Sequence, residues 1–287
     1  MEGRSPSESV FFWPVSATFV AETGQKKESM YIAFAGKGSA GKSTIAALAL
    51  DWLVRQGCQR PLALDADPHQ SLCALLGLQP PATLGALRSQ FGRALLSGRD
   101  PALRPEEDRQ AFAERLTDQA LYAAPGFDLL ALGRWELPGS QCVPNQLLGA
   151  ALARLLPCYP LVLADHEAGI EHIGRLSRQP IDRLVLVATP EALSLDVAER
   201  VLAHAQLVGR PVRAAALLLN RVQPEDLEDP VLAAHIERLA RAGAPLLGAL
   251  PESAGLRALS RAGAGPRQLP AGDPWRRALL ELLPSLA

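Results

Sequence analysis

A glycine-rich loop near the amino end constrains the fold of this chain more than any other stretch. Residues 36–44 read GKGSAGKST, and they follow a short apolar run, YIAFA, at residues 31–35. The loop fits the pattern G-x-x-x-x-G-K-[ST], and a helical pattern begins at Lys42. A strand, such a loop and a helix together predict a phosphate-binding loop, because the backbone N–H groups at a helix N-terminus attract anions.

The rest of the chain alternates apolar runs with helical patterns. Continuous apolar strands separated by helices predict an α/β fold, with a doubly wound, mainly parallel sheet and helices on both faces. In such folds ligands bind at the carboxyl ends of the strands, where the loop lies. The expected strands are residues 31–35, 61–68, 160–169, 183–190, 212–220 and 245–252, and the expected helices include 42–56, 191–208 and 230–242.

We expect a single domain over residues 30–287. Within it, residues 77–128 contain several breakers and are interpreted as helices and loops inserted between the second and third core strands. Residues 1–29 are interpreted as a disordered extension, or as a mis-assigned start with Met30 as the true initiator. The alternative is a docking arm, in which the apolar patch at residues 10–20 packs on a partner.

The composition argues against several classes of partner. The formal net charge of −1 gives no general electrostatic reason to expect nucleic acid or an anionic membrane. The four cysteines show no C-x-C or C-x-x-C spacing, so nothing indicates a secreted disulfide framework. We therefore expect a cytoplasmic protein that does not bind nucleic acid.

Lysine is used sparingly in this chain. There are four lysines among 29 basic residues, and two of them, Lys26 and Lys27, precede the first expected strand. The other two, Lys37 and Lys42, lie in the glycine-rich loop. A compact ammonium is not interchangeable with a planar guanidinium, so both loop lysines are predicted to be there for their chemistry.

The loop and one later strand end form the predicted site for ATP and Mg²⁺. Lys42 would reach the β- and γ-phosphates, and Ser43 would ligate Mg²⁺. Asp165 ends the run LVLAD, which has the form of a Walker B strand, and would bind Mg²⁺ through water. The loop residues predicted to hold the nucleotide are Gly36, Gly38, Ser39, Ala40, Gly41, Lys42, Ser43 and Thr44.

The stretch LDADPHQ places Asp65 and Asp67 at the end of the second expected strand. A carboxylate just beyond a strand, near the γ-phosphate, can orient a water molecule for in-line attack. The competing interpretation is an Asp-Pro turn that merely follows a strand.

The pattern K-G-x-x-G-K-[ST]-T resembles the deviant Walker A loop of the MinD/ParA/nitrogenase iron protein group of dimeric ATPases. The resemblance implies that Lys37 reaches across a subunit interface to the partner's nucleotide. Its added charge would act as an arginine finger does, so hydrolysis would depend on an ATP-bound homodimer. The resemblance also makes Asp67 the water-orienting residue of catalysis, with Asp65 supporting Mg²⁺ or the geometry of the loop.

Other stretches are similar to the CooC-type ATPases, the nickel-inserting accessory proteins of carbon monoxide dehydrogenase. DHEAGIEHIGR at residues 165–175 carries the most specific likeness, and residues 127–148 also resemble that family. The resemblance implies a client metalloenzyme. It also places Glu167, Glu171 and His172 in a switch segment that changes with nucleotide state.

The same family resemblance continues toward the carboxyl end, in LLLNRV and LGALPESAGLRALSRAG. It implies that Asn220 contacts the adenine, where an amide can both donate and accept. A strand-end asparagine that caps the following turn is the competing interpretation. Pro251 and Glu252 fall in the loop after the family's base-binding strand, and we include them in the predicted nucleotide site.

Two positions depart from the family pattern. Ser140 stands where the family has the first cysteine of a C-x-C pair, so only Cys142 remains for a Ni²⁺ or Zn²⁺ site at the dimer interface. Ser39 stands where the family has glycine. If that position needs a positive φ, the serine carries strain of about 1 kcal/mol.

The function that these observations favour is an ATP-hydrolysing, dimeric metallochaperone-like ATPase with a degenerate metal motif. One alternative is a related ATPase that activates a different client without binding metal. Another is a positioning ATPase of the MinD or ParA kind, because residues 274–287 have the outline of a basic amphipathic membrane helix. We expect that segment to pack onto the sheet instead. Electron transfer through an iron–sulfur cluster needs two cysteines per subunit, which Cys142 alone does not supply.

Overall fold

The apolar runs of the sequence form one eight-stranded sheet with the strand order β3-β4-β2-β5-β1-β6-β7-β8. The computed structural model describes residues 29–80, 82–87, 89, 117–134, 153, 155–166, 180–207 and 212–286. Neighbouring strands pair in parallel, except that β3 runs antiparallel to β4. The strands are β1 (Met30–Ala35), β2 (Leu62–Ala66), β3 (Leu121–Ala124), β4 (Phe127–Ala131), β5 (Leu161–His166), β6 (Arg183–Ala188), β7 (Ala215–Val222) and β8 (Leu246–Pro251).

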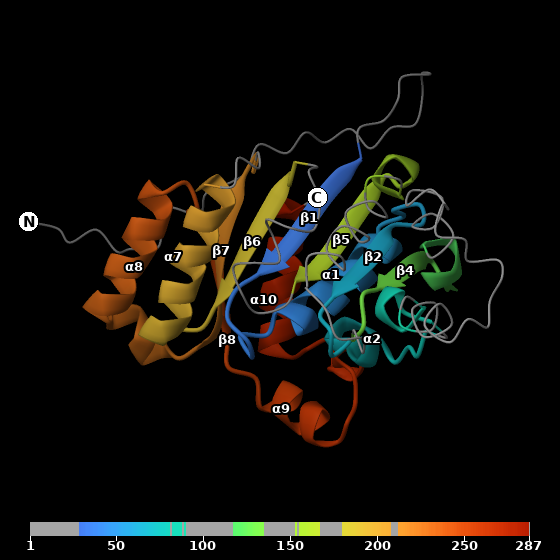
Figure 1. Ribbon diagram of the computed structural model, residues 1–287. Coiled ribbons are helices and arrows are strands. Elements are labelled where there is room, and N and C mark those ends of the chain that lie inside the picture. The colour runs from blue at the N-terminus through green and yellow to red at the C-terminus, as the bar shows by residue number, and fades with distance from the viewer. Residues whose placement is uncertain are drawn as a thin grey trace, which may run out of the picture.

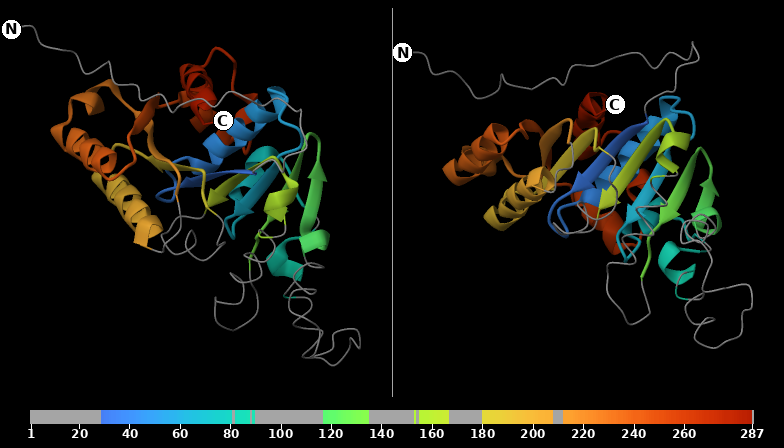
Figure 2. Two further views of the ribbon diagram at one scale, coloured as in Figure 1. Left: turned by 90° about the horizontal axis from the view of Figure 1, so that it is seen from above. Right: turned by 45° about the horizontal axis from the view of Figure 1, so that its top comes forward.

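The helices cover both faces of this sheet, as Figures 1 and 2 show. Helices α7 and α8 pack together on one face, and α1, α2 and α10 pack on the other. The α-helices are α1 (Lys42–Arg55), α2 (Ser71–Leu76), α7 (Ala192–Leu207), α8 (Pro230–Arg241), α9 (Ala254–Arg261) and α10 (Pro274–Leu282). The 3-10 turns are η2 (Leu156–Cys158), η3 (Pro224–Glu228), η4 (Pro266–Gln268) and η5 (Leu283–Ser285). The doubly wound, mainly parallel fold is thereby confirmed.

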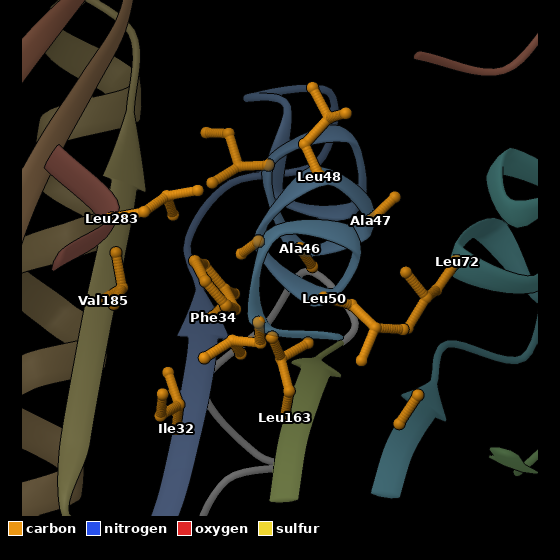
Figure 3. Close-up of a cluster of buried hydrophobic side chains, with 14 of the residues drawn as sticks. Ile32, Phe34, Ala46, Ala47, Leu48, Leu50, Leu72, Leu163, Val185 and Leu283 are labelled. Atoms are coloured by element: carbon orange, nitrogen blue, oxygen red, sulfur yellow. The ribbon is translucent and has the colours of Figure 1, made fainter. Parts of the chain in front are cut away.

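Strand β1 is buried on both sides, which explains its continuous apolar sequence. Successive side chains of a strand point to opposite faces. Tyr31 therefore lies in the core under α7, while Ile32 and Phe34 lie in the core under α1. Figure 3 shows Phe34 beside α1, in the same cluster as Ala46 and Leu50 of that helix. This packing fixes the start of α1, and with it the glycine-rich loop, at the carboxyl end of β1.

The hairpin of β3 and β4 was not expected from the sequence, which indicated only helices and loops up to residue 128. Its turn contains Pro125 and Gly126, and the glycine has φ +87°. Proline followed by a glycine with positive φ is typical of a tight turn that can join two strands. The short β3 has the apolar sequence LYAA, but it is only four residues long and partly exposed, so it does not stand out as the longer, fully buried strands do.

The segment that resembles a membrane helix packs onto the sheet, as expected. Trp275 and Leu279 of α10 are buried, and so is Leu283 in the turn that follows. They join the core cluster beneath α1. Among the helices of the described residues, none is long and apolar enough to cross a membrane.

Candidate nucleotide-binding site

The two end glycines of the loop are required by its backbone and by its neighbours. Gly36 has φ +140° and Gly41 has φ +100°, values that L side chains rarely adopt. A β-carbon on Gly36 would lie 2.1 Å from the carbonyl oxygen of Val187, and one on Gly41 would lie 2.3 Å from Asn220 Nδ2. The loop can therefore pass close to β6 and β7 only with glycine at both positions.

Ser39 adopts a left-handed backbone conformation, the possibility considered above because the resembled family has glycine at this position. Its φ is +67°, so the position does require a positive φ. A serine held there carries strain of about 1 kcal/mol relative to glycine. Ser39 and Gly38 are both exposed, so the loop's outer turn is accessible to a ligand.

The ammonium of Lys42 lies inside the loop. The residue is buried, and Nζ donates a 3.0 Å hydrogen bond to the main-chain carbonyl of Lys37. Phosphate oxygens are strong acceptors for such a buried ammonium. This buried position inside the loop suits the predicted role of Lys42 in binding phosphates, and that role stays a prediction.

Lys37 differs from Lys42 in its surroundings. Its side chain is only partly buried, and it lies close enough to Glu191 to influence that carboxyl group. The Thr189 hydroxyl lowers the pKa of Glu191 most, and the charges of Lys37 and Arg221 lower it further. A positively charged side chain thus stands at the outer rim of the loop.

Asp165 is the strongest indication of a bound cation. It is the next-to-last residue of β5, between Phe34 of β1 and Asp65 of β2, and it is 1% exposed. Neither of its carboxylate oxygens accepts a hydrogen bond of ordinary geometry from a residue that the structure describes. Burial raises its pKa to about 7, and the charge of Asp65 raises it further, although the nearby Ser43 hydroxyl, by hydrogen bonding, and the charge of Lys42 act to lower it. A buried carboxylate whose nearest polar neighbour is a serine hydroxyl fits Mg²⁺, which prefers oxygen ligands.

The two acids at the carboxyl end of β2, Asp65 within the strand and Asp67 just after it, have structural partners. Asp65 accepts hydrogen bonds from the N–H groups of Cys73 (2.9 Å) and Asp67 (3.2 Å), and burial raises its pKa. Asp67 accepts from the His69 N–H at 2.8 Å and from the Ser71 hydroxyl at 2.9 Å. These contacts suit the loop-geometry role for Asp65 and the turn interpretation for Asp67. The water-orienting role of Asp67 stays a prediction.

Asn220 lies at the inner wall of a cavity of about 280 Å³ beside the N-terminus of α1. Its Nδ2 donates to the carbonyl of Ala40 at 2.8 Å, and its Oδ1 accepts from Trp275 Nε1 at 2.7 Å. Both partners are distant in sequence, so the side chain does not cap the turn after β7. The cavity is lined by the loop, β7 and the segment after β8, including Gly41, Thr44, Asn220, Glu252, Leu256 and Trp275.

The structure therefore gathers most of the predicted residues at one edge of the sheet. Pro251 ends β8, and Glu252 pairs with Arg257 at 3.4 Å on the cavity wall. Other predicted residues lie outside the described ones, namely Cys142, Ser140, Glu167, Glu171 and His172. Sequence reasoning missed Trp275 as a site residue. A buried indole N–H needs an acceptor, which is the signal that could have found it.

Replacing Asp165 with asparagine should stabilise the protein when no nucleotide is bound. The pKa of the Asp165 carboxyl is raised from its ordinary value of 3.8 to about 7 in the folded state. Below pH 3.8 the protonated carboxyl therefore favours folding, and this contribution to stability is lost as the pH rises to 7. The gain from Asp165→Asn should therefore be largest near pH 8, about 3 °C or more in Tm, and should shrink toward pH 4. Thermal unfolding followed by circular dichroism measures it.

Asp128 provides the matched control for this prediction. It is also buried, but it accepts hydrogen bonds from Arg60 at 2.6 Å and from the Tyr159 hydroxyl at 2.7 Å. Asp128→Asn should therefore lower Tm near pH 8, because it breaks a paired carboxylate. Equal destabilisation by both changes would mean that the Asp165 carboxylate has partners after all.

Comparison with known proteins agrees with this geometry. The signature of the CobQ/CobB/MinD/ParA nucleotide binding domain covers residues 31–264. The chain is 33% identical to the carbon monoxide dehydrogenase accessory protein CooC of Rhodospirillum rubrum over 248 residues, 82% of this chain and 88% of that protein. It is 29% identical to an uncharacterised ATP-binding protein of Methanocaldococcus jannaschii over 198 residues, 68% of this chain and 76% of that protein.

A solved structure gives the same fold. The MinD cell division protein of Aquifex aeolicus superimposes on this chain with a TM-score of 0.62 and 22% identity. The match covers 89% of this chain and 95% of that one. At this identity the likeness concerns the arrangement of the sheet and helices.

Proposed function

The chain belongs to the CobQ/CobB/MinD/ParA nucleotide-binding domain family, and from this premise we propose that it is an ATP-hydrolysing, nucleotide-dependent dimer that assists the maturation of a metalloenzyme. The observation that carries the proposal is the relation to CooC, which extends over most of both chains. The described residues include Lys42, Ser43 and Asp165, which are predicted to hold the phosphates and Mg²⁺, and their position at the loop supports the proposal. A nickel-dependent client such as carbon monoxide dehydrogenase, or a related enzyme, is the proposed target, and the cytoplasm is the proposed location.

Each described residue of the site has a separate proposed role in binding or hydrolysing ATP. Lys42 and the loop N–H groups would hold the phosphates, while Ser43 and Asp165 would hold Mg²⁺, directly or through water. When bound, Mg²⁺ would neutralise charge on the phosphoryl oxygens. Lys37 stands at the rim of the loop, where its ammonium would reach the nucleotide of a second copy. Closure of the dimer around ATP, and its opening after hydrolysis, would then be relayed to the client.

The proposal that the protein carries a metal ion is its weakest part, because the sequence lacks one of the two cysteines of the family's C-x-C pair. Cys142 is the one cysteine left of the family's pair, so a dimer would offer two thiolates. The cysteines within the described residues are Cys58, Cys73 and Cys158. Cys73 is buried, and burial raises the pKa of its thiol strongly, so it is no ready ligand.

Titration with Ni²⁺ and Zn²⁺, with and without ATP, tests the cargo role. We expect about one ion per nucleotide-bound dimer, because two Cys142 thiolates meet only when the dimer closes. Cys142→Ser should abolish this binding, and Cys158→Ser, which removes an exposed cysteine, should preserve it. No binding above background in the wild-type protein would leave the alternative of an ATPase that activates its client without carrying metal.

A positioning ATPase of the MinD kind is the second candidate, favoured by the shared fold. Its membrane-binding form requires an available amphipathic helix at the carboxyl end. Here Trp275 and Leu279 of α10 are buried against the sheet, which argues against that use. Co-sedimentation with anionic liposomes decides the matter, since ATP-dependent pelleting would support the second candidate over the first.

A further inference from the structure

Three side chains of the kinds that bind metal ions meet between helices α7 and α8. One ring nitrogen of His235 and one carboxylate oxygen from each of Asp196 and Glu199 lie within 4.8 Å of one another. Among the residues that the structure describes, no other His, Cys, Asp and Glu side chains form such a group of three or more. Figures 1 and 2 show the two helices side by side, on the face of the sheet opposite to α1. None of the three residues lines the cavity beside the phosphate loop.

The helices place the three side chains on facing surfaces. Asp196 and Glu199 are three residues apart on α7, a spacing that puts them on one side of the helix. That side faces α8, because Glu199 Oε1 lies 2.7 Å from Nδ1 of His235. The imidazole of His235 is buried, whereas both acids are partly exposed. The group is therefore anchored between the helices and open to solvent at its outer side.

The two polar contacts of His235 Nδ1 conflict with each other. This nitrogen lies 2.7 Å from a carboxylate oxygen of Glu199, which can only accept, and 2.6 Å from a guanidinium nitrogen of Arg238, which can only donate. A ring nitrogen carries either a proton or a lone pair, so one of the two contacts is unfavourable in either form. A metal ion would remove the conflict, because it binds the lone pair of the nitrogen and the carboxylate oxygen together.

The charges of the group also favour a cation. Asp196 and Glu199 bring two carboxylates, and Arg238 brings one guanidinium, which pairs with Glu199 at 3.0 Å. With a neutral imidazole, the four side chains therefore carry a net negative charge. The side chain of Arg238 is 50% exposed, so its guanidinium can turn into water when an ion takes its place.

We propose that Asp196, Glu199 and His235 form a binding site for a divalent transition-metal ion, with Zn²⁺ as the expected ion. Zn²⁺ takes imidazole nitrogen and carboxylate oxygen ligands at about 2.0–2.2 Å, and three protein ligands leave a fourth position for water. Imidazole also suits Ni²⁺, whereas Mg²⁺ and Ca²⁺ prefer oxygen ligands. The site needs neither ATP nor Cys142, so the inference goes beyond the proposed function and does not rest on it.

Equilibrium dialysis of the nucleotide-free, full-length protein against Zn²⁺ tests the site. We expect about one ion per chain, and Cys142→Ser should retain it. Glu199→Gln should weaken binding by about 100-fold, because it removes a charged ligand, and even the loss of a group that only supports a ligand costs about 10- to 100-fold. Co²⁺ bound in place of Zn²⁺ should lack the near-ultraviolet charge-transfer absorption of thiolate ligands.

Arg238→Gln should have the opposite effect and tighten Zn²⁺ binding by about tenfold, because it removes the cation that competes for Glu199 and for the ring nitrogen. A residue that only holds the two helices together would give no such gain. Glu237→Gln is the matched control on α8, since Glu237 pairs with Arg241 at 3.1 Å and lies outside the group. Its Zn²⁺ affinity should stay at the wild-type value.

Thermal unfolding shows that each variant is folded and gives a second measure of binding. Zn²⁺ should raise the Tm of the wild-type protein, because an ion bound only to the folded state stabilises it. It should raise the Tm of Glu199→Gln much less at the same concentration.

A wild-type protein that binds no Zn²⁺ without ATP overturns the site. Wild-type affinity in a folded Glu199→Gln protein, or no tighter binding by Arg238→Gln, also overturns it. Loss of the ion in Cys142→Ser would place the ion at that cysteine and overturn the site as well. None of these results bears on ATP binding. In the titration that tests Cys142, Glu199→Gln is the background in which only the ATP-dependent ion is counted.

Discussion

Lys37→Ala should still bind ATP but should lose hydrolysis by about a thousandfold, the effect of removing a charge supplied in trans to the transferring phosphoryl group. Binding should survive because the loop uses only the main-chain carbonyl of Lys37, which accepts from Lys42 Nζ and which alanine retains. The lost ammonium stands at the rim of the loop beside Glu191, outside the phosphate cradle. The variant should also fail to dimerise when ATP is added.

Single-turnover hydrolysis and analytical ultracentrifugation with ATP measure the two losses separately. Lys37→Arg is the informative companion, because it keeps the charge and changes its shape. We expect it to fail as well, since a planar guanidinium does not replace a compact ammonium at a fitted site. Wild-type turnover by a monomeric Lys37→Ala protein would refute the account of this lysine given above.

Lys42→Ala should weaken nucleotide binding itself, by about 100-fold or more. Its ammonium is the buried charge inside the loop, and charge-assisted hydrogen bonds to phosphate are among the strongest polar contacts in proteins. The change also acts on the metal site. The charge of Lys42 helps to lower the pKa of Asp165, so its removal should raise that pKa further and make Mg²⁺ harder to bind at neutral pH.

Calorimetric titration with Mg·ADP measures the loss of nucleotide affinity in Lys42→Ala. A second titration near pH 8 measures how much of that loss comes from weaker Mg²⁺ binding at Asp165. Part of the affinity should return at the higher pH, because more of the Asp165 carboxyl is then ionised. Circular dichroism confirms that the variant is folded. Wild-type affinity in the Lys42→Ala protein would mean that the loop does not bind phosphates in the predicted way.

The sequence was most informative where local pattern and local structure coincide. The glycine-rich loop and the parallel strands around it follow from short-range patterns of the sequence. The burial of Asp165 was foreseeable for the same reason, because it directly follows the continuous apolar residues LVLA within β5. The positive φ at Ser39 was raised only by the glycine that the resembled family has there.

The sequence was least informative where a residue's partners are distant along the chain. Nothing near Asn220 indicates that Trp275, 55 residues later, donates to its side chain. Likewise, the contact between Asp65 and Cys73 depends on how α2 returns toward β2, which no local pattern specifies. Such contacts arise from tertiary packing, so the roles of Asn220 and Asp65 could be proposed from the sequence but their surroundings could not.

The hairpin at one side of the sheet bears on how two copies of this chain can associate. Its outer strand, β3, has only four residues, and short edge strands offer few unpaired N–H and C=O groups to another chain. At the opposite side, β8 ends in Pro251, which has no N–H to donate. Both margins of the sheet are thus poor templates for strand addition. The proposed dimer is therefore not expected to form by strand addition, and an association through the phosphate loop, as proposed for Lys37, would respond to the nucleotide.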